Sequence, residues 1–181
     1  MPIAIRNARH EDIETMVVLL KQLFTIETDF KIDLRRHRRG LALMIDGCGK
    51  HRCVQVADAD GAVVGMGTAQ LLISTAEGGV VALVEDLVID PQWRRRGVGR
   101  KLMASLERWA LDREVTRMQL LADRTNVSAL DFYDRIGWQM EGEYYQNARY
   151  EDLRPVASRY IHLCHMRVKQ QLKPSGRYLL D

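Results

Sequence analysis

The chain has 181 residues, of which 46% are hydrophobic and 28% charged, a composition that suits one globular domain with a substantial core. The formal net charge of +3 is too small to indicate a nucleic-acid-binding protein by itself. No run approaches the roughly 20 apolar residues that a membrane helix needs, and the first residues lack a secretory signal, so we expect a cytoplasmic protein without membrane contact.

Apolar periodicity and turn residues predict an alternation of strands and helices. In chain order the expected elements are a strand at 3–6, a helix that begins at His10 or Asp12 and runs to 24, a helix at 34–45, strands at 53–57, 63–72 and 80–89, a helix at 97–113, a strand at 118–122, a helix at 126–136, and strands at 138–141 and 160–168. We expect residues 1–168 to form a single domain. The tail 169–181 contains Pro174 and Gly176 and should be loosely held.

Two features of this pattern indicate the fold class. Asp60-Gly61 is a strong hairpin signal, so the strands on either side of it should pair. The strand at 80–89 is almost continuously apolar, which is typical of a central strand covered on both faces. Because hairpins and helical crossovers both occur, the expected fold is a three-layer α/β arrangement, a mixed central β-sheet flanked by helices.

The segment after the predicted central strand has the properties of an anion site. Asp90-Pro91 ends the strand, and a basic loop then opens directly into a helix. The first turn of a helix offers unpaired N–H groups and the positive end of the helix dipole. Gly97 and Gly99 let the backbone approach a ligand closely. Cationic charge suited to a pyrophosphate comes from Arg94, Arg95, Arg96, Arg100 and Lys101.

Two common phosphate loops do not fit this segment. The Walker loop needs a Gly-Lys-Ser/Thr ending, and the dinucleotide loop needs three glycines after the first strand. Arg94-x-x-Gly97-x-Gly99 instead resembles the acetyl-CoA loop of the GNAT superfamily of N-acetyltransferases, Gln/Arg-x-x-Gly-x-Gly/Ala. Asp90-Pro91 before it and the long helix after it are also typical of that family.

A second, separate motif lies downstream. The GNAT pattern Asn-x-x-Ala-x-x-Phe-Tyr-x-x-x-Gly-Phe is matched by Asn126, Ala129, Phe132, Tyr133 and Gly137, with Trp138 in place of the last Phe. The resemblance covers about a third of the chain, from 80 to 138. It implies an enzyme that transfers the acetyl group of acetyl-CoA directly to a primary amine of a small molecule or peptide. It also implies a homodimer.

The resemblance assigns cofactor contacts to the matched positions of the first motif. Backbone groups of Leu87, Val88 and Ile89 are implied to pair with the pantetheine arm of acetyl-CoA. The loop that begins at Arg94 is implied to hold the pyrophosphate through its amides, which are those of Arg95, Arg96, Gly97, Val98, Gly99 and Arg100.

The second motif is implied to complete the site. Asn126 contacts the pantetheine region, and Phe132 packs beside it. Tyr133 points its hydroxyl at the thioester sulfur, where a phenol can protonate the leaving thiolate. Without the motif, Tyr133 would read as a core aromatic residue of an amphipathic helix. Direct transfer needs neither an enzyme nucleophile nor a metal.

A base is also needed, because only a neutral amine attacks the thioester. Glu85 and Asp86 stand on the central strand just before the cofactor contacts, and Glu-Asp at this place also resembles glucosamine-phosphate acetyltransferases. Adjacent strand residues face opposite sides, so only one should reach the acceptor unless a bulge intervenes. We prefer Glu85 as the base, with Asp86 as the alternative. A carboxylate at this place could instead have a purely structural role, paired with an arginine. Some family members carry an acid on the next strand, where this chain has Leu121.

Weaker patterns leave other readings open. Cys48-x-x-His51-x-Cys53 has metal-ligand residue types, but no second pair follows it and no metal is expected. The basic run 35–39 and the acidic, aromatic segment 141–152 read best as solvated surface, although they would suit a charged acceptor. The alternative functions are a non-catalytic acyl-CoA-binding module and a protein N-terminal acetylase. The lack of stacking aromatics in the basic run argues against nucleic acid as a partner.

Overall fold

The computed structural model describes residues 2–26, 32–123, 125–141 and 163–167. In chain order its elements are β1 (Ala4–Asn7), the one-turn helix η1 (His10–Asp12), α1 (Ile13–Ile26), α2 (Leu34–Asp46), β2 (Arg52–Ala59), β3 (Ala62–Ser74), β4 (Gly79–Ile89), the one-turn helix η2 (Pro91–Trp93), α3 (Val98–Leu111), β5 (Arg117–Leu121), α4 (Val127–Arg135), β6 (Gln139–Glu141) and β7 (Leu163–Arg167). The predicted order of strands and helices is confirmed. The outer parts of the last predicted strand and the predicted tail lie outside the described residues.

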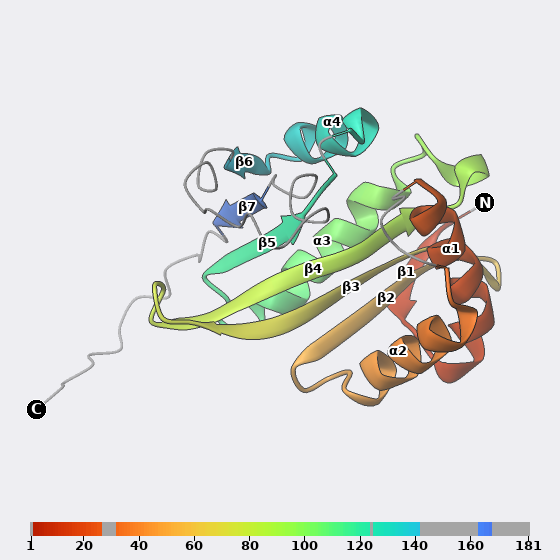
Figure 1. Ribbon diagram of the computed structural model, residues 1–181, viewed down its shortest axis with the longest axis horizontal. Coiled ribbons are helices and arrows are strands. Elements are labelled where there is room, and N and C mark those ends of the chain that lie inside the picture. The colour runs from red at the N-terminus through yellow and green to blue at the C-terminus, as the bar shows by residue number, and fades with distance from the viewer. Residues whose placement is uncertain (1, 27–31, 124, 142–162, 168–181) are drawn as a thin grey trace, which may run out of the picture.

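The strands form one sheet in the order β1-β2-β3-β4-β5-β7-β6, with β4 in the middle as predicted. Neighbouring strands are antiparallel except β4 and β5, which run parallel because α3 carries the chain back between them. Helices α1 and α2 lie on one face of the sheet and α3 on the other (Figure 1). This confirms the predicted mixed, three-layer α/β class. None of the helices in the described part of the chain is long and apolar enough to cross a membrane.

Apolar side chains fill both spaces between the layers. Met16 and Leu20 of α1 pack with Met66 and Val88 on one face of the sheet. On the other face the core contains residues of α3, α4, β4 and β5, among them Met103, Leu106, Val84, Leu120 and Tyr133, together with Trp138 just before β6. Val84 and Val88 of the same strand therefore face opposite layers, which the strict alternation of a regular strand does not allow.

Local sequence explains the tight hairpin between β2 and β3. Asp60 has φ 52° and Gly61 has φ 91°, and two left-handed residues in succession are what a type I′ turn requires. The predicted Asp60-Gly61 turn is thus confirmed. Part of the basic run on α2 also has a structural partner, since Arg38 donates to Glu14 of α1 through two nitrogens at 2.6 and 2.7 Å.

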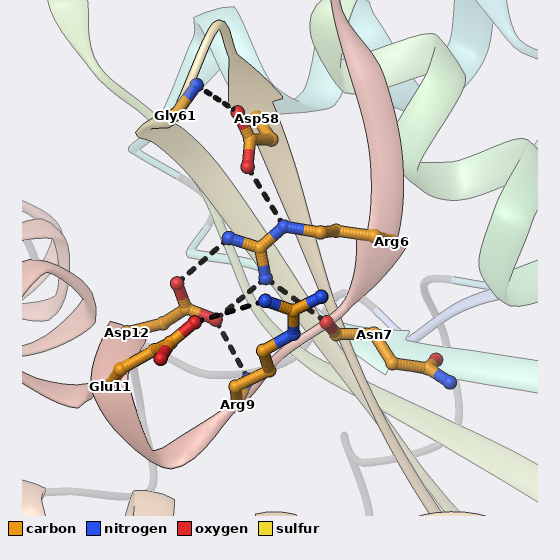
Figure 2. Close-up of polar contacts among 7 residues, drawn as sticks. All are labelled: Arg6, Asn7, Arg9, Glu11, Asp12, Asp58 and Gly61. Carbon is orange, nitrogen blue, oxygen red and sulfur yellow. Dashed lines mark hydrogen bonds and ion pairs between the residues drawn. The ribbon is translucent and has the colours of Figure 1, made fainter.

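Arg6 of β1 makes hydrogen bonds to two neighbouring elements (Figure 2). The Arg6 guanidinium donates from Nη1 and Nη2 to the two carboxylate oxygens of Asp12 at 2.8 and 2.9 Å, and from Nε to Asp58 at 2.8 Å. Asp12 also accepts the main-chain N–H of Arg9 at 2.7 Å, and Asp58 accepts that of Gly61 at 2.6 Å. The network therefore joins β1, the start of the first helix and the β2–β3 hairpin.

Candidate active site

The centre of the sheet opens between its two parallel strands. Pairing between β4 and β5 covers only Ala82 to Val84 on one strand and Met118 to Leu120 on the other. β4 continues to Ile89, and no strand in the described part of the chain pairs with it on that side. Over residues 85–89, β4 thus has an edge in the middle of the protein with which no described strand pairs. A strand edge of this kind can bind an extended ligand through main-chain hydrogen bonds.

A β-bulge at Asp86 sets the directions of the side chains along this edge. Thr68 of β3 pairs with Glu85, but Met66 pairs with Val88, so β4 holds one more residue than β3 between these pairs. Asp86 is at the bulge and has a left-handed φ of 53°. Gly67 lies across from the bulge, and a Cβ there would meet Leu87 Cδ1 at 3.1 Å and Leu106 Cδ1 at 3.2 Å. Glycine therefore makes the room that Leu87 fills.

Glu85 projects from the same face of the sheet as the side chains that pack on α1. It is directly opposite Thr68, and Met66 two residues along β3 belongs to the core beneath α1. The Glu85 side chain is exposed and accepts a hydrogen bond from Gln70 Nε2 at 2.9 Å. Among the described residues, the recorded side-chain partner of Glu85 is thus an amide on β3 rather than an arginine. Asp86 is half-buried at the bulge.

The loop between β4 and α3, with the first turn of α3, is the candidate anion cradle and contains the glycines and arginines that the sequence singles out. The Asp90 side chain accepts from the N–H of Gln92 at 2.9 Å, which begins the turn η2. Arg95 and Gly97 both have left-handed φ values, 58° and 77°, and the space around the missing Gly97 Cβ is open. The first helical bond of α3 runs from Lys101 N–H to the Gly97 carbonyl at 3.1 Å. The N–H groups that precede it, at 98–100, are the unpaired donors of a helix start.

The basic side chains of the cradle make different contacts. Arg94 Nε donates to the carbonyl of Ile89 at 3.0 Å, and Arg96 stacks on the Trp93 ring at 5.1 Å. Arg100 reaches the carbonyl of Arg135 at 3.5 Å. All these arginine side chains are exposed, so the cradle combines main-chain donors with a surrounding positive potential.

The second motif lies against the first. A Cβ on Gly99 would meet the Phe132 ring at 3.2 Å, so the missing side chain lets α4 approach the start of α3. Tyr133 is 8% exposed and shares a core cluster with Val84 and Leu120, where the paired part of β4 and β5 ends. The oxygen Oδ1 of Asn126 accepts the N–H of Ala129 at 3.2 Å, which makes it the N-cap of α4. Asn126 thus has a structural role that the resemblance did not include.

The structure places the two motifs and Glu85 near the part of β4 beyond its pairing with β5, but other features lie apart. A hollow of about 590 Å³ around Arg6, Asp12 and Asp58 contains none of the predicted site residues. Burial raises the pKa of the Cys53 thiol to about 11 and also raises that of Cys48, which disfavours the thiolate form that binds metals. Within the described residues, no group of three or more His, Cys, Asp or Glu side chains is placed to hold a metal ion.

The sequence motifs missed three residues of β3, which pairs with β4 on the side opposite this edge, namely Gly67, Thr68 and Gln70. A Gly-x-Gly at 65–67 and a polar pair at 68 and 70 are visible in the sequence. Their relation to Glu85 depends on the register of the β3–β4 hairpin, which the motifs do not specify.

Comparison with known proteins agrees with this geometry. The sequence matches the Acetyltransferase (GNAT) family over residues 20–138, about two thirds of the chain. The chain belongs to the GNAT acetyltransferase family. It is 28% identical over 169 residues to the thialysine N-epsilon-acetyltransferase of Mus musculus, which covers 86% of this chain and 97% of that protein.

Solved GNAT structures share the fold at low sequence identity. The PaiA N-acetyltransferase of Thermoplasma acidophilum, in complex with coenzyme A, is 17% identical with a TM-score of 0.70, covering 92% of this chain and 99% of that one. An N-acetyltransferase of Staphylococcus aureus is 14% identical with a TM-score of 0.73, covering 93% and 100%. The GNAT chain described here is an acetyl-CoA-dependent N-acetyltransferase, and its acceptors are amines.

Proposed function

We propose that this GNAT enzyme transfers the acetyl group directly to a primary aliphatic amine of a small molecule while both substrates are bound. The observation that carries the proposal is the edge of β4 with which no described strand pairs. It begins at Glu85, beyond the last residue paired with β5, and leads into the anion cradle before α3. An extended anionic co-substrate and a carboxylate for the amine therefore meet on one strand.

The residues present fit coenzyme A. Main-chain groups of 87–89 offer a strand edge for the amides of the pantetheine arm. The N–H groups of 98–100 offer donors for the pyrophosphate, and the arginines at 94–96 add positive charge around it. When bound there, acetyl-CoA supplies an acetyl group activated as a thioester.

The side chains of the chain itself then divide the proton transfers. Glu85 takes a proton from the ammonium form of the acceptor, which leaves a nitrogen lone pair free to attack. Asp86, one residue further at the bulge, is the alternative base. Tyr133 gives a proton to the sulfur as the C–N bond forms and the C–S bond breaks, and its phenolate takes up the second proton that the acylated nitrogen loses. Its ring is packed against Phe132 and Trp138, with centroids 5.3 and 6.1 Å away, and this packing restricts the directions open to its hydroxyl.

The relatives suggest the acceptor class. The thialysine N-epsilon-acetyltransferases of Bos taurus and Mus musculus are named for an amine on the side chain of an amino acid. An exposed carboxylate such as Glu85 can bind the ammonium group of such a side chain at the site of transfer. The homodimer and the cytoplasmic location stay predictions, which light scattering and cell fractionation test.

The test is thiol release from acetyl-CoA across a panel of amines that contains thialysine, lysine, a diamine, an amino sugar and a peptide with a free N-terminus. We expect release with aliphatic side-chain amines, and a fall of at least about 10²-fold in kcat for Glu85→Gln, the range of a lost general base. The control Glu114→Gln changes an exposed carboxylate outside the site and should keep the wild-type rate. Tight acetyl-CoA binding without release for any amine would make the protein an acyl-CoA-binding module, and release with the peptide alone would make it an N-terminal acetylase.

A further inference from the structure

Gln70 stands beside the proposed base although it belongs to neither sequence motif. Its side-chain Nε2 donates to Glu85 Oε2 at 2.9 Å. In the β3–β4 register Glu85 is opposite Thr68, so Gln70 is its diagonal neighbour on the same face of the sheet. The Thr68 hydroxyl donates to the main-chain carbonyl of Glu85 at 3.0 Å, and Thr68 is 2% exposed. β3 therefore holds both the main chain and the side chain of Glu85.

An exposed glutamate needs such support to act as a base. Its side chain has several rotatable bonds, and fixing them in one geometry lowers the conformational entropy. A base must come within about 2.6–3.2 Å of the proton that it takes. Displacement by about 1 Å can lower a rate by about 10²-fold. The amide of Gln70 is not itself a base, so any effect it has on proton transfer acts through Glu85.

We propose that Gln70 is a positioning residue that holds Glu85 for the acceptor amine. Its amide occupies Oε2 and leaves Oε1 of the carboxylate to receive the proton. The proposal rests on the proposed function, in which Glu85 is the base. It differs from a role in sheet pairing alone, because a residue that only stabilises the sheet would affect folding and acetyl-CoA binding along with turnover.

The experiment is a double-mutant cycle on kcat. Gln70→Met removes the donor and keeps the length of the side chain. We expect kcat to fall about 10-fold, within the range for a misplaced catalytic group, while the KM and Kd for acetyl-CoA and the Tm stay at wild-type values. On a Glu85→Ala background the same substitution should leave kcat unchanged. Gln70→Glu also keeps the length but repels Glu85, and it should lower kcat at least as much as Gln70→Met.

Gln139→Met is the matched control, since Gln139 is an exposed glutamine on β6 outside the site. It should behave as wild type. Wild-type kcat in both Gln70 variants overturns the proposal, and so does a loss that persists in full on the Glu85→Ala background. Failure of the proposed function is distinct from both, because then the wild type releases no thiol or Glu85→Ala turns over as fast as the wild type.

Discussion

Replacing Arg6 by Met tests how far the network of Figure 2 stabilises the protein. The substitution keeps an apolar stem and removes the guanidinium that Asp12 and Asp58 share. Asp12 is 6% exposed and would lose its cationic partner at a nearly buried position, whereas Asp58 is 17% exposed and borders the hollow that water can enter. Loss of one partner from a buried ion pair destabilises a protein by about 3–5 kcal/mol. Because Arg6 is itself 25% exposed, water screens part of the interaction, and we expect the lower end, about 3 kcal/mol.

Urea unfolding at several pH values measures the difference in unfolding free energy between wild type and Arg6→Met. In thermal unfolding, at about 2–4 °C per kcal/mol for a chain of this size, the Tm of the variant should be lower by about 6–12 °C. The hydrogen bond from Arg6 lowers the pKa of Asp12 below its ordinary 3.8 in the folded protein. A lowered carboxyl pKa stabilises the fold above the ordinary pKa, and this stabilisation is lost as the pH falls through the folded-state value. The difference in unfolding free energy between wild type and variant should therefore become smaller as the pH is lowered from 7 toward 3.

The control is Arg9→Met, which breaks an exposed ion pair with Glu11 in the same region. Both side chains of that pair are about two-thirds exposed, so the change in unfolding free energy should be close to zero. If Arg6→Met is no more destabilising than Arg9→Met at pH 7, or if its effect does not depend on pH, then the network is not what stabilises this corner of the fold.

Three further outcomes follow from the site and its supports. Burial raises the pKa of Glu107, whose carboxylate accepts from Trp138 Nε1 at 3.4 Å, so the contribution of Glu107 to stability should fall as the pH rises above the ordinary 4.5. Glu107→Gln should therefore raise the Tm at pH 7 and leave it unchanged at pH 4, and an equal shift at both pH values in thermal scans would contradict this. Gly97→Ala places a Cβ on a residue with φ 77°, which costs about 1–2 kcal/mol. Calorimetry should show weaker acetyl-CoA binding for this variant, and an unchanged Kd with unchanged Tm would remove Gly97 from the cradle. Tyr133→Phe should lower kcat by about 10²-fold or more and nearly keep the Kd of acetyl-CoA, whereas wild-type turnover would remove the phenol from the chemistry.

The sequence predicts the fold well because each element has a clear period and clear ends. The hairpin at Asp60-Gly61 and the central strand before Asp90-Pro91 are local signals, and the structure has both where they are expected. The bulge at Asp86 is different, because an aspartate with a left-handed φ inside a strand has no local cause. It depends on Leu87 filling the space above Gly67, which lies on another strand.

Of the candidate site, the sequence indicates the parts that lie within one continuous segment. The anion cradle comes from one continuous segment, so its glycines and arginines could be read in order. The hydrogen bond from Gln70 to Glu85 joins side chains on two neighbouring strands. It depends on the register of these strands, and neither sequence motif includes Gln70. The N-cap role of Asn126 is a local geometry that the family pattern alone does not distinguish from a ligand contact.

The strand order has a consequence for synthesis on the ribosome. β7 pairs with β5 on one side and β6 on the other, so it closes a sheet whose other described strands are made earlier. About 40 residues separate the end of β5 from the start of β7, which at about 5–20 residues per second takes about 2–8 s to translate. During that interval the β5 edge has no β7 to pair with, and an unpaired edge is a template for other chains. Each nascent chain therefore spends seconds with its β5 edge unpaired. On a polysome, where nascent chains are close together, such edges can pair with one another.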